Sequence, residues 1–553
     1  MQETIVQNFE NESIIIEKYR KRIQNGCLEI KNNDKLVSIS FISKFNIQQL
    51  TIKNCPKIKP ILKSDSILEL TLKNCNINNI DELILDNVEV INLQENKLST
   101  IQNINRFKNL QKLNLAKNLI KDISFLKDSH LIKLQLQYNI IVDISILESQ
   151  CNLIELDISM NQNVDLTPLS QLRQLLILKI SFCNVSNIGI FKPLVNLEEL
   201  DVSYCKGIEN YKFENQTKLV KLNMHIEDQK ENYSFLKQFT NLKELKLTPF
   251  STSLDLETIS QLVQLTKLEL GSIYYLSITN ISQFNQLINL EYLDLPDSRI
   301  IDISPLQDLV QLKFLNLCRN KVCSLAPLKN MVHLKDLNIA QNSGVNLCGL
   351  QYLVGLAKLQ ATDIKIQNIQ EIKCLINLKE LKLDYNRSIN ITPLQYLTKL
   401  VKLSLNNCYI NDIYALTPLN KLEYLDISSN LITNLSPLME MNNLTELNTD
   451  LNKIQDFTAI KTLPYFEQFT TIQFGQYKLS DTKKQIASAM HNTYISTTYL
   501  RKIQLSRNHK QNKIYQVKNN VNQLLVSYNN YLLSLTSCMK QYIQNLSKGE
   551  IYQ

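Results

Sequence analysis

The sequence predicts an α/β solenoid, a stack of about 20 short coils that share one apolar interior. Leucines recur at steps of three and two residues, as in LKFLNLCRNKV from Leu312 to Val322, which fits neither a helix nor a simply alternating strand. This spacing returns in eighteen units between Ile67 and Leu444, mostly at intervals of 22 residues, and a fixed period of this length is typical of solenoids. Asn320 stands where another apolar residue is expected, and many units have Asn or Cys there.

Each unit is expected to begin with a short strand. Leu315 and Leu317 are two residues apart, so they should lie on one face of a strand that pairs in parallel with its neighbours. Asn320 follows where the chain must turn away, and its amide can both donate to and accept from backbone groups there. Stacked units should therefore form an asparagine ladder. Five cysteines occupy the same place and are expected to be buried, reduced thiols: Cys55, Cys75, Cys183, Cys205 and Cys408.

The second half of each unit is expected to form a short helical turn on the convex side. Several units carry Ser or Thr followed by Pro, as in Thr167-Pro168 and Ser304-Pro305. This pair predicts a hydroxyl N-cap with proline at the first helical position. Five or six residues suit a 3₁₀ helix better than a long α-helix.

The complete pattern, LxxLxLxxNxIxxIxxLxxL, resembles the leucine-rich repeat family in its 22-residue class. The segment IIDISPLQDLVQL is similar to the repeats of internalins, and the uninterrupted 22-residue units are similar to those of the phosphatase-regulating members of the family. The resemblance covers about residues 25–475. It implies a horseshoe with a parallel concave sheet, short 3₁₀ or helical convex segments and helical caps.

Three parts are expected along the chain: an N-terminal capping helix in residues 1–24, the solenoid in 25–475 and a basic helical tail in 476–553. The tail has 11 Lys and Arg against 2 Asp and Glu, a balance of +9, whereas the whole chain has +8, so the rest sums to −1. Apolar residues between 513 and 546 follow helical steps of three and four. That segment predicts a helix or helical hairpin packed on the last repeat, a coiled coil for self-association or an amphipathic partner helix.

The sequence offers no catalytic set, so we expect no enzyme activity, metal, cofactor or small-molecule substrate. The five histidines are far apart, and neither a P-loop, GxGxxG, HExxH nor GxSxG is present. The first 22 residues have no basic region followed by an apolar one, and no apolar run reaches the length of a membrane helix. A cytoplasmic protein is therefore expected.

A column of large side chains is the candidate binding site. The residue just before the ladder position is large in five consecutive units, and stacking should align these residues: Tyr138, Met160, Phe182, Tyr204 and Ile226. Asp157 and Asp201 lie in the adjacent column. Aromatic residues beside small neighbours are typical of binding hot spots. The alternative is that this position leans on its own loop and is half-buried.

These observations predict a scaffold that binds a partner protein on the concave face of the array. One alternative is a regulatory subunit of an enzyme such as a protein phosphatase, which the family resemblance allows. Another is association of the basic tail with nucleic acid or an anionic membrane.

Overall fold

The structure is a computed structural model that describes residues 17, 19–102, 104–207, 213, 215–226, 233–249, 256–271, 278–454, 459 and 471–473. The chain divides into two compact units, Met1–Gln473 and Phe474–Gln553, and all described residues belong to the first. The predicted tail therefore lies outside the described residues. Most of the predicted capping helix does too, although Glu17, Tyr19 and Arg20 are helical.

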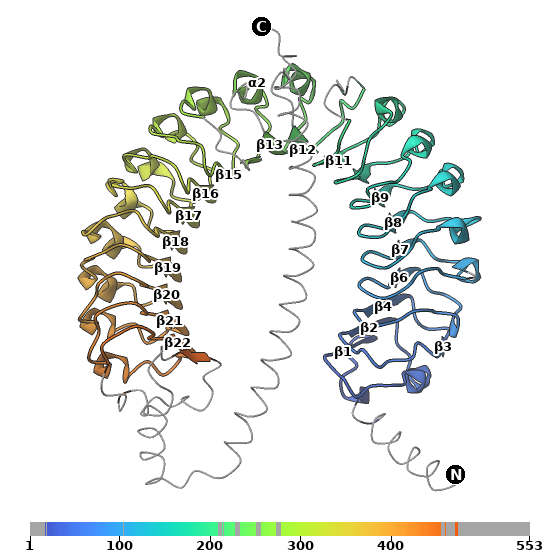
Figure 1. Cartoon of the computed structure of the whole chain (residues 1–553), viewed down its shortest axis with the longest axis horizontal. Helices are drawn as coiled ribbons and strands as arrows, with labels where there is room; N and C mark the ends of the chain where they lie inside the picture. Colours follow the sequence, from blue (N-terminus) through green and yellow to red (C-terminus); the bar gives the residue numbers. More distant parts are fainter. Residues whose placement is uncertain are drawn as a thin grey trace, which may run out of the picture. The chain divides into compact units, whose positions relative to one another are not determined.

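One parallel sheet of 21 strands runs through the described residues, and each strand pairs with the strand of the next coil (Figure 1). The register is 22 residues across most steps, as in Leu315 opposite Leu337. A second, two-stranded sheet joins β3 (Leu62–Ser64) and β5 (Leu83–Leu85). The strands of the main sheet are β1 (Cys27–Lys31), β2 (Gln49–Lys53), β4 (Glu69–Lys73), β6 (Val90–Asn92), β7 (Lys112–Asn114), β8 (Lys133–Gln135), β9 (Glu155–Asp157), β10 (Ile177–Lys179), β11 (Glu199–Val202), β12 (Lys221–Ile226), β13 (Glu244–Pro249), β14 (Lys267–Leu270), β15 (Tyr292–Asp294), β16 (Phe314–Asn316), β17 (Asp336–Asn338), β18 (Lys358–Gln360), β19 (Glu380–Lys382), β20 (Lys402–Ser404), β21 (Tyr424–Asp426), β22 (Glu446–Asn448) and β23 (Thr471–Gln473).

Short helices form the convex side of the coils, opposite the sheet (Figure 1). Apart from the one-turn helix α2 (Leu256–Ser260), the named convex helices are 3₁₀ helices, as the sequence predicted. They are η1 (Ser40–Lys44), η2 (Ile104–Arg106), η3 (Ser124–Leu126), η4 (Ser145–Ser149), η5 (Thr167–Gln171), η6 (Ile188–Phe191), η7 (Tyr233–Gln238), η8 (Ser282–Gln286), η9 (Ser304–Leu306), η10 (Ala326–Asn330), η11 (Leu350–Tyr352), η12 (Gln370–Cys374), η13 (Thr392–Tyr396), η14 (Tyr414–Leu416) and η15 (Ser436–Leu438).

The start of these helices differs from the prediction. The hydroxyl residue of each Ser/Thr-Pro pair is the first residue of its helix, so the expectation that it is the N-cap was wrong. In η5 the N-cap is Leu166, and the carboxylate of Asp165 accepts hydrogen bonds from the N–H and the hydroxyl of Thr167. Asp302 binds Ser304 of η9 in the same way. The turn is thus closed by the Asp two residues earlier, which the sequence pattern also contains.

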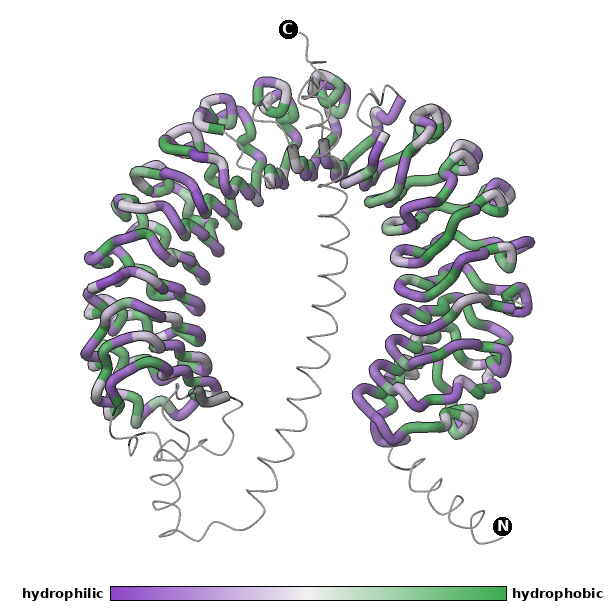
Figure 2. The backbone as a smooth tube through the Cα atoms, in the orientation of Figure 1, coloured by the Kyte–Doolittle hydropathy of each residue, from purple (hydrophilic) through white to green (hydrophobic). Residues whose placement is uncertain are grey.

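The core lies between the sheet and the convex helices, and it runs through the coils. Leu315 and Leu317 are both completely buried, which confirms that they face the same interior. Figure 2 shows hydrophobic backbone positions alternating with hydrophilic turns along every coil. Because each coil covers the apolar side of the next, the solenoid predicted from the sequence is the observed fold.

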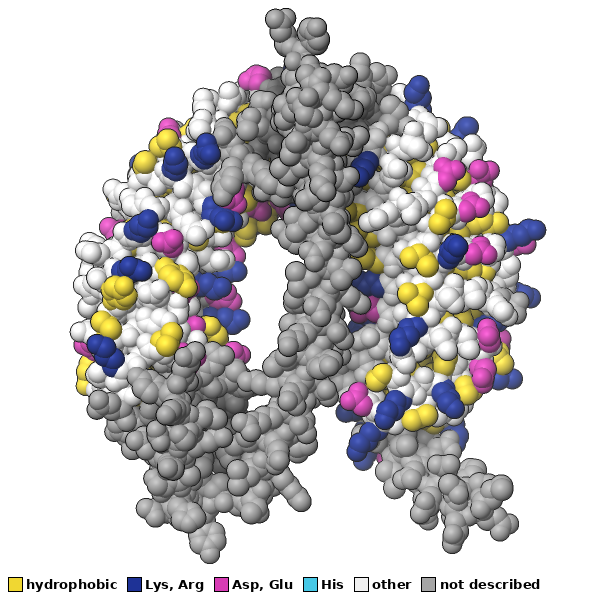
Figure 3. Space-filling view, in the orientation of Figure 1, with side chains coloured by type: hydrophobic (Ala, Val, Ile, Leu, Met, Phe, Trp, Pro, Cys, Tyr) yellow, Lys and Arg dark blue, Asp and Glu magenta, His cyan; other side chains and the backbone are white. Residues whose placement is uncertain are grey.

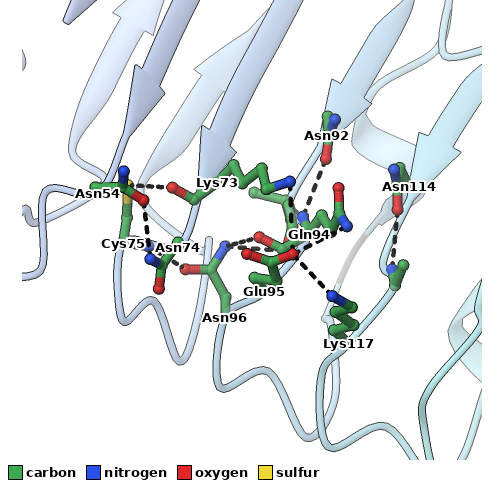
Figure 4. A network of polar contacts seen from close by, with 12 residues as sticks. Asn54, Lys73, Asn74, Cys75, Asn92, Gln94, Glu95, Asn96, Asn114 and Lys117 are labelled. Atoms are coloured by element: carbon green, nitrogen blue, oxygen red, sulfur yellow. Dashed lines mark hydrogen bonds and ion pairs between the residues drawn. The ribbon is translucent and has the colours of Figure 1, made fainter. Parts of the chain in front are cut away.

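The asparagine ladder is also present. The amide nitrogen of Asn320 donates to the carbonyl oxygens of Leu295 (2.8 Å) and Leu317 (3.0 Å), and its oxygen accepts from the N–H groups of Ser298 (3.1 Å) and Ile300 (2.9 Å). Each amide therefore ties its own coil to the preceding one. Figure 4 shows the equivalent network around Asn96, whose oxygen accepts from the N–H of Cys75 at 3.0 Å.

Cysteine keeps only half of this pattern. The thiol of Cys205 donates to the carbonyl of Ile180 (3.0 Å) and that of Cys408 to Leu383 (3.1 Å), the bond that the asparagine nitrogen makes to the preceding coil. Burial raises the pKa of Cys183 and of Cys408 to about 12, so both thiols stay protonated. All cysteines in the described ranges are free thiols.

Candidate protein-binding site

Four of the five predicted column residues lie at equivalent places, on left-handed turns just after their strands. Tyr138, Met160, Phe182 and Tyr204 have φ between 56° and 63°. The turns are tied to one another, because the N–H of Tyr138 donates to the carbonyl of Ser159 (2.9 Å) in the next coil, and the following coils repeat this bond. The four side chains therefore form one column at the edge of the sheet where the strands end. We call Tyr138, Met160, Phe182 and Tyr204 the aromatic ridge.

The aromatic ridge contains a continuous ring stack. The rings of Phe182 and Tyr204 are 4.5 Å apart and 17° from parallel, and Tyr204 stacks on the imidazole of His225 at 4.3 Å. At the other end, the ammonium group of Lys117 lies 5.7 Å from the ring centre of Tyr138. Stacking of this kind restricts the side-chain rotamers, so the ridge is largely preformed.

The fifth predicted residue, Ile226, does not share the turn. It is the last residue of strand β12, which pairs with β13 up to Pro249, and its side chain lies outside the described residues. A β-branched residue is strongly disfavoured at positive φ, and proline cannot adopt it at all. The strands of these two coils therefore continue for six residues, and His225, one position earlier, supplies the ring that meets Tyr204.

Exposure differs along the aromatic ridge. The side chains of Tyr138 (49%) and Phe182 (40%) are exposed, whereas Met160 and Tyr204 are partly covered, as the half-buried alternative describes. His225 is only 5% exposed. Burial lowers its pKa, so the imidazole is neutral at pH 7. The accessible part of the ridge is thus centred on Tyr138 and Phe182.

The two predicted acidic residues hold the turns that present the ridge. Asp157 accepts from the N–H of Ser159 (3.0 Å). Asp201 accepts from the N–H (3.0 Å) and hydroxyl (2.6 Å) of Ser203 and, through its other oxygen, from Asn223 (2.9 Å). Burial raises the pKa of Asp157, an effect that its bonds to Ser159 oppose. These carboxylates contribute to the position of the ridge as well as to its charge.

Three aliphatic residues beside Tyr138 escaped the sequence analysis. Leu119, Ile140 and Val142 are all about half exposed, and Ile140 reaches 58%. Leu119 and Ile140 directly follow the ladder asparagines Asn118 and Asn139. The sequence could have indicated this surface, because several other units have Lys or Arg directly after the ladder residue where these two units have Leu and Ile. Figure 3 shows exposed hydrophobic side chains gathered on the coils drawn on the right, which carry β6 to β9.

A hollow lined by paired charges adjoins the ridge on the sheet. It has a volume of about 240 Å³ and spans β10 to β14. Glu199 lies between Lys179 (2.9 Å) and Lys221 (3.5 Å), and Glu269 lies between Lys246 (3.1 Å) and Lys267 (2.8 Å). Because the charges of its lining largely neutralise one another, the hollow shows no preference for one sign of ligand charge.

The described residues contain no group of three or more His, Cys, Asp or Glu side chains placed to hold a metal ion. Among those same residues, no helix has the length and apolarity needed to cross a membrane. What the site offers is a preformed aromatic and aliphatic surface beside a field of paired charges.

Comparison with known proteins was informative at the level of structure only. No family model matches the chain, and no curated protein does. Among solved structures, a chain of the mouse RP105/MD-1 complex is similar over 83% of this chain and 88% of its own, at 19% identity and a TM-score of 0.55. The chain has the leucine-rich repeat fold.

Further leucine-rich repeat structures match less closely in three dimensions. An internalin (InlF) from Listeria monocytogenes is 22% identical over 68% of this chain and 88% of its own, with a TM-score of 0.40. A leucine-rich repeat protein from Leptospira interrogans is 21% identical over 82% and 93%, with a TM-score of 0.33. The match to the RP105/MD-1 chain confirms, as a fold, the resemblance inferred from the repeat pattern.

Proposed function

We propose that this leucine-rich repeat protein is a scaffold that binds a partner protein through the aromatic ridge and the concave surface next to it. The exposed, preformed ring of Phe182, stacked on Tyr204 and followed by His225, is the observation that carries the proposal. Aromatic side chains bury a large area while losing little conformational entropy, and for this reason they dominate protein interfaces.

The neighbouring surface fits the same role. Leu119, Ile140 and Val142 extend the ridge into an exposed apolar patch, which is uncommon on a soluble surface without a partner. The paired charges of the hollow would form the polar rim that surrounds an interface core. The proposal includes a binding role without catalysis, and it includes a cytoplasmic location. The phosphatase-subunit and tail alternatives stay predictions.

The experiment is a pull-down with the double variant Phe182→Ala, Tyr204→Ala. We expect partner capture to fall by a factor of about 30 or more, since truncation of a central aromatic pair removes at least ~2 kcal/mol of binding free energy. The thermal melt by circular dichroism should stay near that of the parent, because Phe182 is exposed and neither replacement creates a core cavity.

Tyr385→Ala is the matched control. Tyr385 occupies the same left-handed position in a distant coil, with φ 62°, and it is also exposed. Its replacement should leave partner capture unchanged. If the double variant captures the partner as well as the parent and the control do, the aromatic ridge is not the binding site.

A further inference from the structure

A second exposed apolar surface lies at the opposite edge of the sheet. It consists of the residue four places before the first residue of each strand from β14 to β19, and in these six consecutive coils that residue is always Val or Ile. The six side chains are 37–56% exposed. We call them the aliphatic column: Val263, Ile288, Val310, Val332, Val354 and Ile376.

The aliphatic column cannot be explained by the fold. The coil needs the leucines on either side, such as Leu353 and Leu356, which are buried, but not an apolar residue at Val354 itself. Among the other coils this residue is Val only at Val195, and it is polar or charged in several others, for example Arg173, Thr398 and Asn420. Single exposed aliphatic residues are ordinary, whereas six at equivalent places form a continuous patch on the order of 500 Å², as large as the functional patches of soluble proteins.

Charge surrounds this column but does not enter it. In the same six coils, the two residues before each column residue and the one residue after it are almost all uncharged. The one formal charge among them is on Asp308. Three residues before the column residues lie the exposed Lys329 and Lys373, and three residues after them lie the exposed Lys335 and Lys379. The same later position also has Glu291 and Lys313, which pair with each other. Within the described ranges, none of Lys329, Lys335, Lys373 and Lys379 is within ion-pair distance of a carboxylate, whereas most lysines of the sheet are paired.

The arrangement selects among possible occupants. A second copy of the chain would bring the same lysines against one another, which is unfavourable. A bilayer is engaged by long apolar side chains such as Trp, Phe and Leu, and this column has only short β-branched ones. An acidic partner with an apolar seam meets both the column and its basic rim.

The spacing points to a helix. Neighbouring coils are separated by about 4.8 Å at the sheet, close to the 5.4 Å rise of one helical turn. A helix that lies along the column would place one side chain per turn between successive Val and Ile residues, for about five turns. We propose that the aliphatic column docks an amphipathic helix of a partner protein, with an aliphatic seam and acidic flanks. This surface is separate from the aromatic ridge.

The test uses the full chain and a synthetic probe. The probe is a fluorescein-labelled 18-residue helical peptide with Leu along one seam and Glu on both flanks, and a scrambled peptide of equal composition is its control. Binding is followed by fluorescence anisotropy. We expect saturable binding of the seam peptide only, weakened about tenfold or more by Val332→Asp with Val354→Asp. Leu431→Asp, at an exposed aliphatic position on the other edge, should leave the affinity unchanged.

Charge reversal tests the basic rim. Lys335→Glu with Lys379→Glu should weaken the Glu-flanked peptide about tenfold and should restore binding for a Lys-flanked version. Phe182→Ala with Tyr204→Ala should have no effect, so this inference and the proposed function can fail separately. The inference is overturned if the scrambled peptide binds equally, or if the Asp variants bind like the parent. It is also overturned if the parent forms a dimer in light scattering that the Asp variants abolish, or if the parent sediments with phosphatidylserine vesicles and the Asp variants do not.

Discussion

Replacement of Asn320 by Ala should open the turn between two coils. The side chain is buried and makes five hydrogen bonds to backbone groups of both coils, four of them at 2.8–3.1 Å and a longer one to Cys318 at 3.3 Å. Alanine leaves those N–H and C=O groups without their partners, at a net cost of about 1 kcal/mol each. We expect the local opening free energy to fall by about 3–4 kcal/mol.

Hydrogen exchange read by mass spectrometry is the suitable assay, because a long repeat array need not unfold in one step. Peptides that contain Ser298 and Ile300 should exchange about 100-fold faster or more in the variant. For Asn320→Cys the local opening free energy should fall by about half as much as for Asn320→Ala. A thiol at this place can keep the bond to the preceding coil, as the thiol of Cys408 does.

Asn289→Ala is the control for this experiment. Asn289 is exposed and donates one side-chain hydrogen bond, to the carbonyl of Val263 at 2.9 Å, so its loss should be below about 1 kcal/mol. The reasoning is refuted if Asn320→Ala accelerates exchange no more than Asn289→Ala does, because the ladder would then not hold the coils together.

Two further predictions concern titratable groups. Because burial lowers the pKa of His225, the unfolded chain binds the proton more readily than the folded chain, and the free energy of unfolding should fall as the pH drops below about 6.5. Urea titrations at pH 7.5 and 5.5 should show a smaller fall for His225→Gln than for the parent. An equal fall would contradict this prediction. Burial raises the pKa of Cys183 to about 12, so its thiol should stay unmodified by a thiol reagent at pH 8 until the protein unfolds. The exposed Cys323 and Cys348 should be labelled in the folded protein. Rapid labelling of Cys183 in the folded protein would contradict its burial in the ladder.

The repeat and its interior could be predicted because they depend on residue type alone. Leu315, Leu317 and Asn320 recur at the same places, and a coil that buries the leucines must turn at the asparagine. Much of the aromatic ridge was predictable for the same reason, since Tyr138 and Phe182 precede ladder residues at fixed spacing.

The failures come from backbone conformation rather than from the repeat. Ile226 matches the ridge by counting, but positive φ is disfavoured for a β-branched residue, so β12 runs on and His225 takes the stacking role. The Ser/Thr-Pro pairs begin their helices one residue earlier than expected, because Asp165 and Asp302 close the turns. Neither effect is visible in a pattern of apolar spacing.

Site-specific photocrosslinking tests the central claim most directly. The photoreactive residue p-benzoylphenylalanine would replace Phe182 in one sample of the full chain and Tyr396, an exposed tyrosine on the convex side, in another. After irradiation in cell extract, one partner protein should be joined to position 182 and not to position 396. Equal crosslinking at both positions, or none at 182 while the partner is still captured, would contradict the account.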